Sequence, residues 1–426
     1  MEWLYDTILF PLVLFLILFV GGYFLLRLKG FWLLHPLSAA HLAWGDRPGG
    51  DLLRGVTMAL AGTLGVGNIV GVALGILVGG AGSVFWMVLT AFFAMAVKYA
   101  EVALSIHTRE AGPDGWQGGV PYYMRGKGRF GGVLPTLFSL LCLVCALVEG
   151  CIIQANAVAE SLSLFGVSPL LSGVGIAVLA AFFLLRGKEA VGRFTALWIP
   201  VATFAYFILC FGVIFRNLDG VPKAFAYIIQ DAFRPMAGAG GILGFFTANC
   251  VREGTARGLL SNEAGCGTAP LAHVTTQDTT PVRQGLWGVF EVFLDTVVVC
   301  TMTALACLTG APQPVTHTPF AYLSLAFSSA WGGSAPYLLA IILFIFAFST
   351  SLAWSYYGIS ALSALTRRPL VHRIYLTALL LALPLGAMLT VRAAYLTTDI
   401  LLALMCLINL PALLLRAKEI CKHKFT

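Results

Sequence analysis

The chain has 426 residues, of which 59% are hydrophobic and only 11% are charged. A soluble domain carries about 25% charged residues, so this composition excludes a soluble globular protein. A formal net charge of +7 would suit a nucleic-acid partner. The basic residues instead lie in loops between long apolar runs, which is the pattern that orients a membrane protein, and we expect no nucleic-acid partner.

The first apolar run covers about residues 8–26 and has the wrong flanks for a signal peptide. A signal peptide begins with basic residues, whereas this chain opens with Glu2 and Asp6 and carries Arg27 and Lys29 after the run. We therefore predict that residues 1–30 form a retained, extra transmembrane helix that starts outside the cell and ends inside it.

Eleven apolar runs predict eleven membrane-spanning helices, because about 18 or more residues with few charges are typical of a span. Most of the 26 lysines and arginines then fall in predicted cytoplasmic segments. This asymmetry predicts a plasma (inner) membrane protein with its N-terminus outside and a cytoplasmic tail at residues 417–426. The predicted spans lie at about residues 7–27, 54–79, 82–106, 134–163, 168–186, 193–215, 240–268, 285–309, 335–363, 372–391 and 397–416.

Two of these spans, the second and the seventh, are unusually rich in glycine, which weakens a helix interior by about 1 kcal/mol per residue. Residues 61–68 read AGTLGVGN, and glycines recur from residue 238 to residue 267. Glycine-interrupted spans at matching places in two halves are typical of transporters built from inverted repeats. We therefore predict an all-α integral membrane protein with an extra N-terminal helix and two inverted five-helix repeats, at residues 54–215 and 240–416. The first and sixth core helices would be broken.

A break near residues 63–68 would free backbone N–H and carbonyl groups at membrane depth, where they must be buried or line a cavity. Such N–H groups suit a carboxylate, and the carbonyls suit a cation. Farther along the same span, Gly67, Gly71, Gly75 and Gly79 are spaced by four. This spacing predicts a smooth helix face for close packing against another helix.

Residues 257–273, which read RGLLSNEAGCGTAPLAH, form the most specific string in the chain. The string resembles the SNEAGxGxAPxAH signature of the alanine or glycine:cation symporter family. Other blocks resemble that family in the same order, from about residue 54 to residue 365. They are GVGNIVGVA at 65–73, FWM at 85–87, KYAE at 98–101, QAN at 154–156, FAFST at 346–350 and WSYYG at 354–358.

The resemblance implies sodium-coupled uptake of alanine or glycine on the bacterial leucine-transporter fold, whose two broken helices would be the two glycine-rich spans. The implied amino-acid site is made by Gly65, Val66, Gly67, Asn68, Gln154 and Trp354. The implied site for co-transported Na⁺ is made by the hydroxyls of Ser349 and Thr350 and the carbonyls of Ala61, Leu64 and Phe346.

Several of these residues have simpler interpretations. A lone polar residue such as Gln154 often bonds a neighbouring helix, and Ser349 and Thr350 can bond their own helix carbonyls. For Arg257, Glu263 and His273, which we place at the cytoplasmic end, we favour structural pairing or a gate over substrate contact.

The chain departs from the family pattern at positions that bear on the substrate. Val66 stands where many members have threonine, and Glu149 and Glu291 fall within spans where no acid is expected. These differences weaken the substrate assignment more than the fold.

The sequence also bears on three alternative functions, namely a proton-coupled or other solute transporter, a channel and a membrane enzyme. The same fold could be coupled to protons or carry a different small solute, and an intramembrane acid such as Glu149 would serve a proton path. A channel would need repeated rings of polar or carbonyl groups, which the sequence lacks. A membrane enzyme would need a Ser/His set or metal ligands near one interface, and the scattered histidines argue against one. The oligomeric state, the ion stoichiometry and the choice between alanine and glycine stay open.

Overall fold

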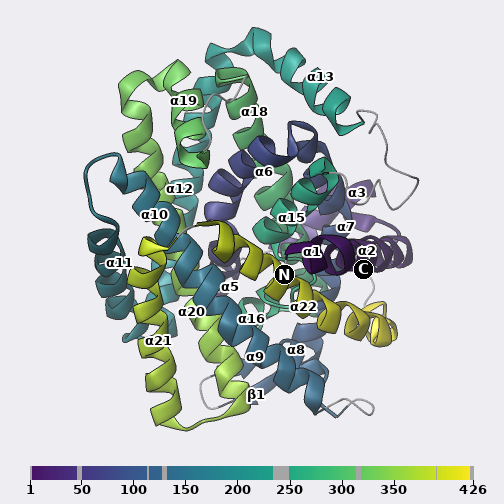
Figure 1. Cartoon of the computed structure of the whole chain (residues 1–426). Helices are drawn as coiled ribbons and strands as arrows, with labels where there is room; N and C mark the ends of the chain where they lie inside the picture. Colours follow the sequence, from purple (N-terminus) through teal and green to yellow (C-terminus); the bar gives the residue numbers. More distant parts are fainter. Residues whose placement is uncertain are drawn as a thin grey trace.

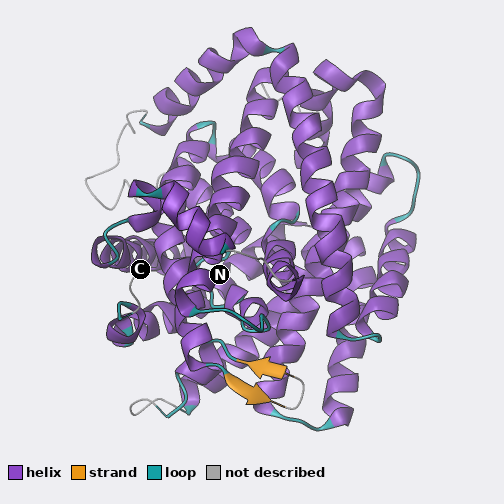
Figure 2. Ribbon diagram, turned by 180° about the vertical axis from the view of Figure 1, so that it is seen from behind, coloured by secondary structure: helices purple, strands orange, loops and turns teal. Residues whose placement is uncertain are grey.

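The structure is a computed structural model that describes residues 2–45, 50–112, 115–126, 132–233, 249–312, 318–389 and 391–422. The described chain is helical apart from one small hairpin, in which Glu110 pairs with Gln117 (Figure 2). Near the middle of Figure 1 lie α5 (Gly50–Thr63), α15 (Asn249–Asn262) and α20 (Ala335–Leu365). The ends of the molecule differ: α13, α18 and α19 gather at one end, called here the α13 end, and the hairpin lies at the other, the hairpin end.

The N-terminal segment is a continuous apolar helix from Tyr5 to Arg27, long and apolar enough to cross a membrane, as predicted. It packs against α7 and α22, and Gly21 allows this approach because a Cβ there would lie 2.8 Å from the Cβ of Phe93. Its elements are α1 (Glu2–Leu4), η1 (Tyr5–Leu9) and α2 (Phe10–Arg27), followed by two short helices, α3 (Phe31–Leu34) and α4 (Pro36–Trp44).

The first half of the core begins with a broken span. Helix α5 (Gly50–Thr63) is separated by three residues from η2 (Gly67–Gly71) and α6 (Val72–Gly79), and the two parts are bent by 41°. This bend confirms the break predicted from the glycines. The half continues with α7 (Gly82–Thr108), β1 (Glu110–Gly112), β2 (Gly115–Gln117), α8 (Val120–Tyr123), α9 (Val133–Leu147), η3 (Val148–Ile153), α10 (Gln154–Ser163), α11 (Pro169–Leu184) and α12 (Lys188–Arg216).

The second half contains the other predicted break. Residues 263–268 interrupt the helix between α15 and α16, with positive φ at Glu263 (52°), Gly265 (85°) and Gly267 (76°). Residues 240–248 of this predicted span lie outside the described residues. The elements are η4 (Leu218–Gly220), α13 (Val221–Ala232), α15 (Asn249–Asn262), α16 (Ala269–His273), α17 (Pro281–Val292), η5 (Phe293–Cys300), α18 (Thr301–Gly310), α19 (Pro319–Trp331), η6 (Gly332–Ser334), α20 (Ala335–Leu365), α21 (Pro369–Met388), α22 (Val391–Leu415) and α23 (Ala417–Ile420).

Among the described residues, eight helices are long and apolar enough to cross a membrane, and the bent α5–α6 pair would make a ninth. The predicted fifth span is a shorter apolar helix, Pro169–Leu184, and the described part of the seventh, α15, has 14 residues. The chain is thus an all-helical, multi-pass membrane protein. The count of eleven spans and the inverted repeats remain predictions.

The two broken spans pack against each other through the glycine face of α6, as the four-residue spacing predicted. A Cβ at Gly75 would lie 3.3 Å from Cγ of Arg257, and one at Gly79 would lie 2.7 Å from Cβ of Glu253. Any larger side chain on this face would push α15 away. The glycines therefore bring the second span within contact distance of the seventh.

Candidate functional site

Three helical segments near the core contain π-helical turns, and each carries a buried polar side chain. Asn68 lies in η2, Glu149 in η3 and Asp295 in η5, and they are between 0% and 4% exposed. A π turn inside an α-helix frequently marks a functional site, because it displaces side chains and backbone groups from the regular hydrogen-bond pattern.

Asn68 connects the first break to two other helices. Its Oδ1 accepts a hydrogen bond from the N–H of Gly65 (3.0 Å), within the break itself. Its Nδ2 lies within hydrogen-bond distance of Ser261 Oγ (2.9 Å) and Asp295 Oδ1 (2.6 Å). The side-chain amide therefore ties the broken second span to α15 and to η5, as a residue at the centre of a shared site would.

Asp295 and Ser261 belong to this cluster, although the sequence prediction did not include them. Ser261 and Thr296 both donate to Oδ2 of Asp295, the latter at 2.9 Å. Asp295 is fully buried, and no basic side chain among the described residues lies at salt-bridge distance from it. The available signal was a single acid in the apolar stretch VFLDTVVVC at residues 292–300, which is typical of a functional residue in a membrane helix.

Gln154 also reaches the first break, from the start of α10. Its Oε1 accepts from the N–H of Val66 at 3.4 Å. Its Nε2 donates to Oε1 of Glu149 at 3.2 Å. The structure therefore brings together Gln154 and Val66, two residues predicted to bind the amino acid, and Glu149 holds the Gln154 amide.

Three of the residues predicted to bind Na⁺ meet where α20 passes the break, namely Ala61, Leu64 and Thr350. The hydroxyl of Thr350 donates to the carbonyls of Ala61 (2.9 Å) and Leu64 (3.4 Å). Gly65 is required here, since a Cβ would lie 2.6 Å from Thr350 Oγ1. Carbonyls of an unwound helix beside a hydroxyl of another helix are the oxygen donors that a sodium ion prefers.

The other two predicted sodium ligands lie on the same helix but are placed differently. Phe346 is one turn before Thr350 and is 2% exposed. The Ser349 hydroxyl donates to the Ile345 carbonyl of its own helix at 2.7 Å. Ser349 therefore bonds a carbonyl of its own helix, which is the simpler of its two predicted roles, whereas Thr350 reaches across to the broken span.

Trp354 lies one turn beyond Thr350 and is completely buried. Its Nε1 donates to Oε1 of Glu263 at 2.9 Å, and Glu263 accepts a second hydrogen bond from Thr268 (2.5 Å). The indole also packs directly on Gly150, where any Cβ would overlap the Cβ of Trp354. Trp354 is thus fixed between η3 and the second break.

Arg257 and Glu263 lie apart from each other. Arg257 Nη2 bonds Asp399 Oδ2 at 2.6 Å, and its Nε is 3.6 Å from Glu253 Oε2. Arg257 belongs to α15, before the break and on the α13 side, whereas His273 belongs to α16, after it. The second break thus lies between Arg257 and His273, which we predicted at the same, cytoplasmic end, and the side of the membrane on which each lies stays a prediction.

Comparison with known proteins identifies the family to which the chain belongs. The family model described as "Sodium:alanine symporter family" matches residues 1–424. The chain belongs to this family. The symporter is 35% identical to the sodium/alanine symporter AgcS of Methanococcus maripaludis, with 95% of this chain and 91% of the relative covered. It is 34% identical to the uncharacterized transporter YflA of Bacillus subtilis (98% and 90% covered) and 30% identical to that organism's probable sodium/glutamine symporter GlnT (85% and 75% covered).

The protein is therefore a sodium-coupled amino-acid symporter and not an enzyme, and Na⁺ is its co-transported ion. The Na⁺ is cargo, in agreement with the oxygen donors around Thr350.

A second buried network stabilises the hairpin side of the symporter. Lys98 Nζ lies 3.4 Å from Glu291 and 3.8 Å from Glu101, and all three side chains are 0% exposed. His273 Nε2 is 2.9 Å from the other oxygen of Glu291. Glu291, the acid that was unexpected within a span, is therefore one member of a structural ion pair that joins α7 to α17.

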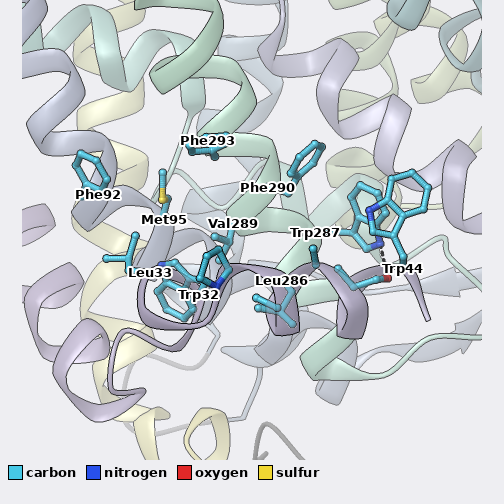
Figure 3. Close-up of a pocket in the computed structure, with 14 residues that line it drawn as sticks. Trp32, Leu33, Trp44, Phe92, Met95, Leu286, Trp287, Val289, Phe290 and Phe293 are labelled. Atoms are coloured by element: carbon cyan, nitrogen blue, oxygen red, sulfur yellow. Dashed lines mark hydrogen bonds between the residues drawn. The ribbon is translucent and has the colours of Figure 1, made fainter. Parts of the chain in front are cut away.

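One cavity of the symporter, of about 350 Å³, has no lining residue from the broken helices (Figure 3). It is lined by residues of α3, α4, α7, α17 and η5, which are mostly aromatic and aliphatic, including Trp32, Trp44 and Phe293. The indole N–H of Trp287 at its edge bonds the Ala43 carbonyl at 2.9 Å. Such a lining offers almost no partner for a zwitterion, so the broken helices remain the candidate amino-acid site.

Proposed function

We propose that this symporter carries alanine or glycine into the cell together with Na⁺, and that both bind at the break between α5 and η2. The observation that carries the proposal is the contact of Thr350 with the Ala61 and Leu64 carbonyls. This contact supports a sodium site that exists only while α20 is held against the broken span. Because a ligand shifts a conformational equilibrium by its differential affinity, Na⁺ would stabilise this closed arrangement.

The N–H groups of the break support a binding place for the amino-acid carboxylate. In the structure, side-chain amide oxygens of Asn68 and Gln154 accept from Gly65 N and Val66 N. A substrate carboxylate would replace one of these neutral acceptors, and the partial positive charge at a helix start would favour it. Gly67 is the first residue of η2, directly after this break. Sodium and carboxylate would then bind within a few residues of each other, so each would strengthen the other's binding.

The small size of the substrate is supported by Trp354. The indole is held by Glu263 and packs on Gly150, which leaves little freedom for the ring to move. A glutamine-sized side chain, as the name of GlnT suggests for that relative, would have to displace it. We therefore favour alanine or glycine over larger amino acids.

Replacement of Trp354 by alanine should reverse this preference. We expect alanine uptake to fall at least about tenfold and competition by glutamine to rise, since a pocket with excess space loses about 1–3 kcal/mol per missing methylene contact. The measurement is competition against labelled alanine in reconstituted vesicles. Trp354→Phe, which keeps a ring but loses the N–H bond to Glu263, is the matched control and should stay alanine-selective. An unchanged competition series for Trp354→Ala would assign Trp354 to packing alone.

The orientation and the gate are also proposals. The excess of basic residues in alternate loops supports an outside N-terminus and a cytoplasmic C-terminus. In that orientation, the Arg257–Asp399 pair on the α13 side would close the external path. Glu263 would affect the amino-acid site through its hydrogen bond with Trp354. The two predicted repeats, at residues 54–215 and 240–416, would move relative to each other around the two breaks.

Proton coupling in place of sodium is the second candidate, and the buried Glu149 is the observation that favours it. Coupling ions are separated by the salt replacement described in the Discussion.

The experiment that separates candidate substrates is uptake of labelled alanine against a panel of unlabelled glycine, serine and glutamine. We expect glycine and alanine to compete, and serine and glutamine to compete weakly. Strong competition by glutamine alone would identify glutamine, rather than alanine or glycine, as the substrate.

A further inference from the structure

The buried ionisable side chains of the symporter are unequally divided between acids and bases. Lys98 lies beside Glu101 and Glu291, and Arg257 lies beside Glu253 and Asp399. Three other buried acids have no basic side chain at salt-bridge distance among the described residues, and these are Glu149, Glu263 and Asp295. An isolated carboxylate at membrane depth is costly unless hydrogen-bond donors or a cation compensate for the lost water.

The three acids differ in how many donors they have. Asp295 accepts from Asn68, Ser261 and Thr296. Glu263 accepts one hydrogen bond on each oxygen, from Trp354 and Thr268.

Glu149 is the least compensated of the three. Its Oε1 accepts from Gln154, but its Oε2 has no hydrogen-bond partner among the described residues, although the side chain is 4% exposed. A neutral carboxyl group at this position removes the cost of burying the charge.

The surroundings of Glu149 offer little to stabilise a negative charge. Its segment η3 packs against α9, α10, α20, α21 and α22. The charges that act on it are those of Asp399 on α22 and Arg257 on α15, and these two are already paired with each other.

The other titratable groups that interact with Glu149 are neutral or acidic: Cys145 of α9, Tyr395 of α22 and Glu263 of the second break. Cys151 lies two residues along η3, and Glu160 of α10 and Tyr357 of α20 lie on elements that pack against η3. On α21, His372, Arg373 and Tyr375 all lie in the first two turns, whereas it is Gly386 that touches η3, at Ile152. None of these described groups places a positive charge beside Glu149.

We propose that Glu149 is a proton-binding site, and that Gln154 links this proton to the binding of the amino acid. The proton is taken from water when Glu149 becomes neutral and returns to water when it ionises. Gln154 donates to Glu149 with one end of its amide and accepts from Val66 with the other. A change of charge on Glu149 therefore reaches the N–H group of the break through a single side chain.

The direction of the linkage follows from charge and rests on the proposed function. If the amino-acid carboxylate binds at Val66 N, it approaches Gln154 and thus the neighbourhood of Glu149. A second negative charge there disfavours the ionised form of Glu149. Amino-acid binding should therefore take up a proton, and lowering the pH should tighten it; by linkage the two effects are equal in free energy.

The proton site is tested by infrared spectroscopy of the purified full-length symporter in lipid. We expect the carbonyl stretch of a protonated carboxylic acid in the wild type, its increase on addition of alanine, and its loss in Glu149→Gln. Glu160→Gln, an acid-to-amide change farther along the same helix, is the control and should keep the band. A band that persists in Glu149→Gln, or a wild type without one at any pH, would overturn the proposal.

The linkage is tested by alanine binding as a function of pH at saturating Na⁺. We expect the Kd of the wild type to change about fivefold or more across the range in which the band titrates, and that of Glu149→Gln to be independent of pH. Proton uptake by weakly buffered wild type on adding alanine is a readout that needs no variant, and its absence contradicts the linkage. A wild type that shows the band but binds no alanine would instead reject the proposed function.

Discussion

Replacement of Thr350 by valine should raise the sodium concentration for half-maximal alanine uptake by about tenfold or more. Valine keeps the shape of threonine but removes the oxygen that reaches the Ala61 and Leu64 carbonyls. Loss of one hydrogen-bonding or ligand oxygen in a buried site costs about 1–3 kcal/mol, and 1.4 kcal/mol is a factor of ten in affinity. The measurement is initial uptake in vesicles over a series of sodium concentrations, with the amount of folded protein determined in parallel.

Two variants give this prediction its controls. Thr309→Val removes a hydroxyl that only bonds the Leu305 carbonyl of its own helix at 2.7 Å, so its sodium dependence should stay normal. Ser349→Ala tests the second predicted hydroxyl, which bonds Ile345 in this structure. Normal sodium dependence in the Ser349→Ala, Thr350→Val double variant would show that these two hydroxyls do not bind Na⁺.

The largest loss of folded protein is expected for Lys98→Met. Glu291 and Glu101 would then lie completely buried without their cation, since both are 0% exposed beside Lys98. Removing one partner of a buried ion pair costs about 3–5 kcal/mol. Thermal unfolding of the detergent-purified protein, together with its yield from membranes, should show a strongly destabilised variant.

A double variant and a surface control separate charge from packing. Lys98→Met with Glu291→Gln should recover part of the lost stability, because the remaining amide carries no charge. Lys223→Met, on an exposed face of α13, should unfold like the wild type. If Lys98→Met alone were as stable as the wild type, the Lys98–Glu291 pair would have no structural role.

The breaks could be predicted because glycine density is a local property of the sequence. The α5–η2 bend and the packing of Gly75 on Arg257 agree with that prediction, and the structure also brings Thr350 to Ala61. The last of these came from a resemblance in motif order, since residues almost 300 positions apart give no local signal of contact.

The site contacts that the sequence did not predict are tertiary contacts between distant helices. Asp295 and Ser261 join Asn68 through three separate helices, and nothing in the local pattern pairs them. Glu291 looked isolated along the chain but is paired across α7 with Lys98. The glycine pattern of the seventh span did not locate its break, at residues 263–268, and so did not predict that the break separates Arg257 from His273.

Sodium-coupled uptake of alanine or glycine is tested most simply in reconstituted protein. Uptake of the two labelled amino acids is measured with an inward gradient of Na⁺, K⁺ or choline chloride of equal size. We expect accumulation of alanine or glycine above equilibrium with Na⁺ alone, and only slow equilibration with K⁺ or choline. Equal accumulation in all three salts, or none of either amino acid in Na⁺, would contradict sodium-coupled transport of a small neutral amino acid by this protein.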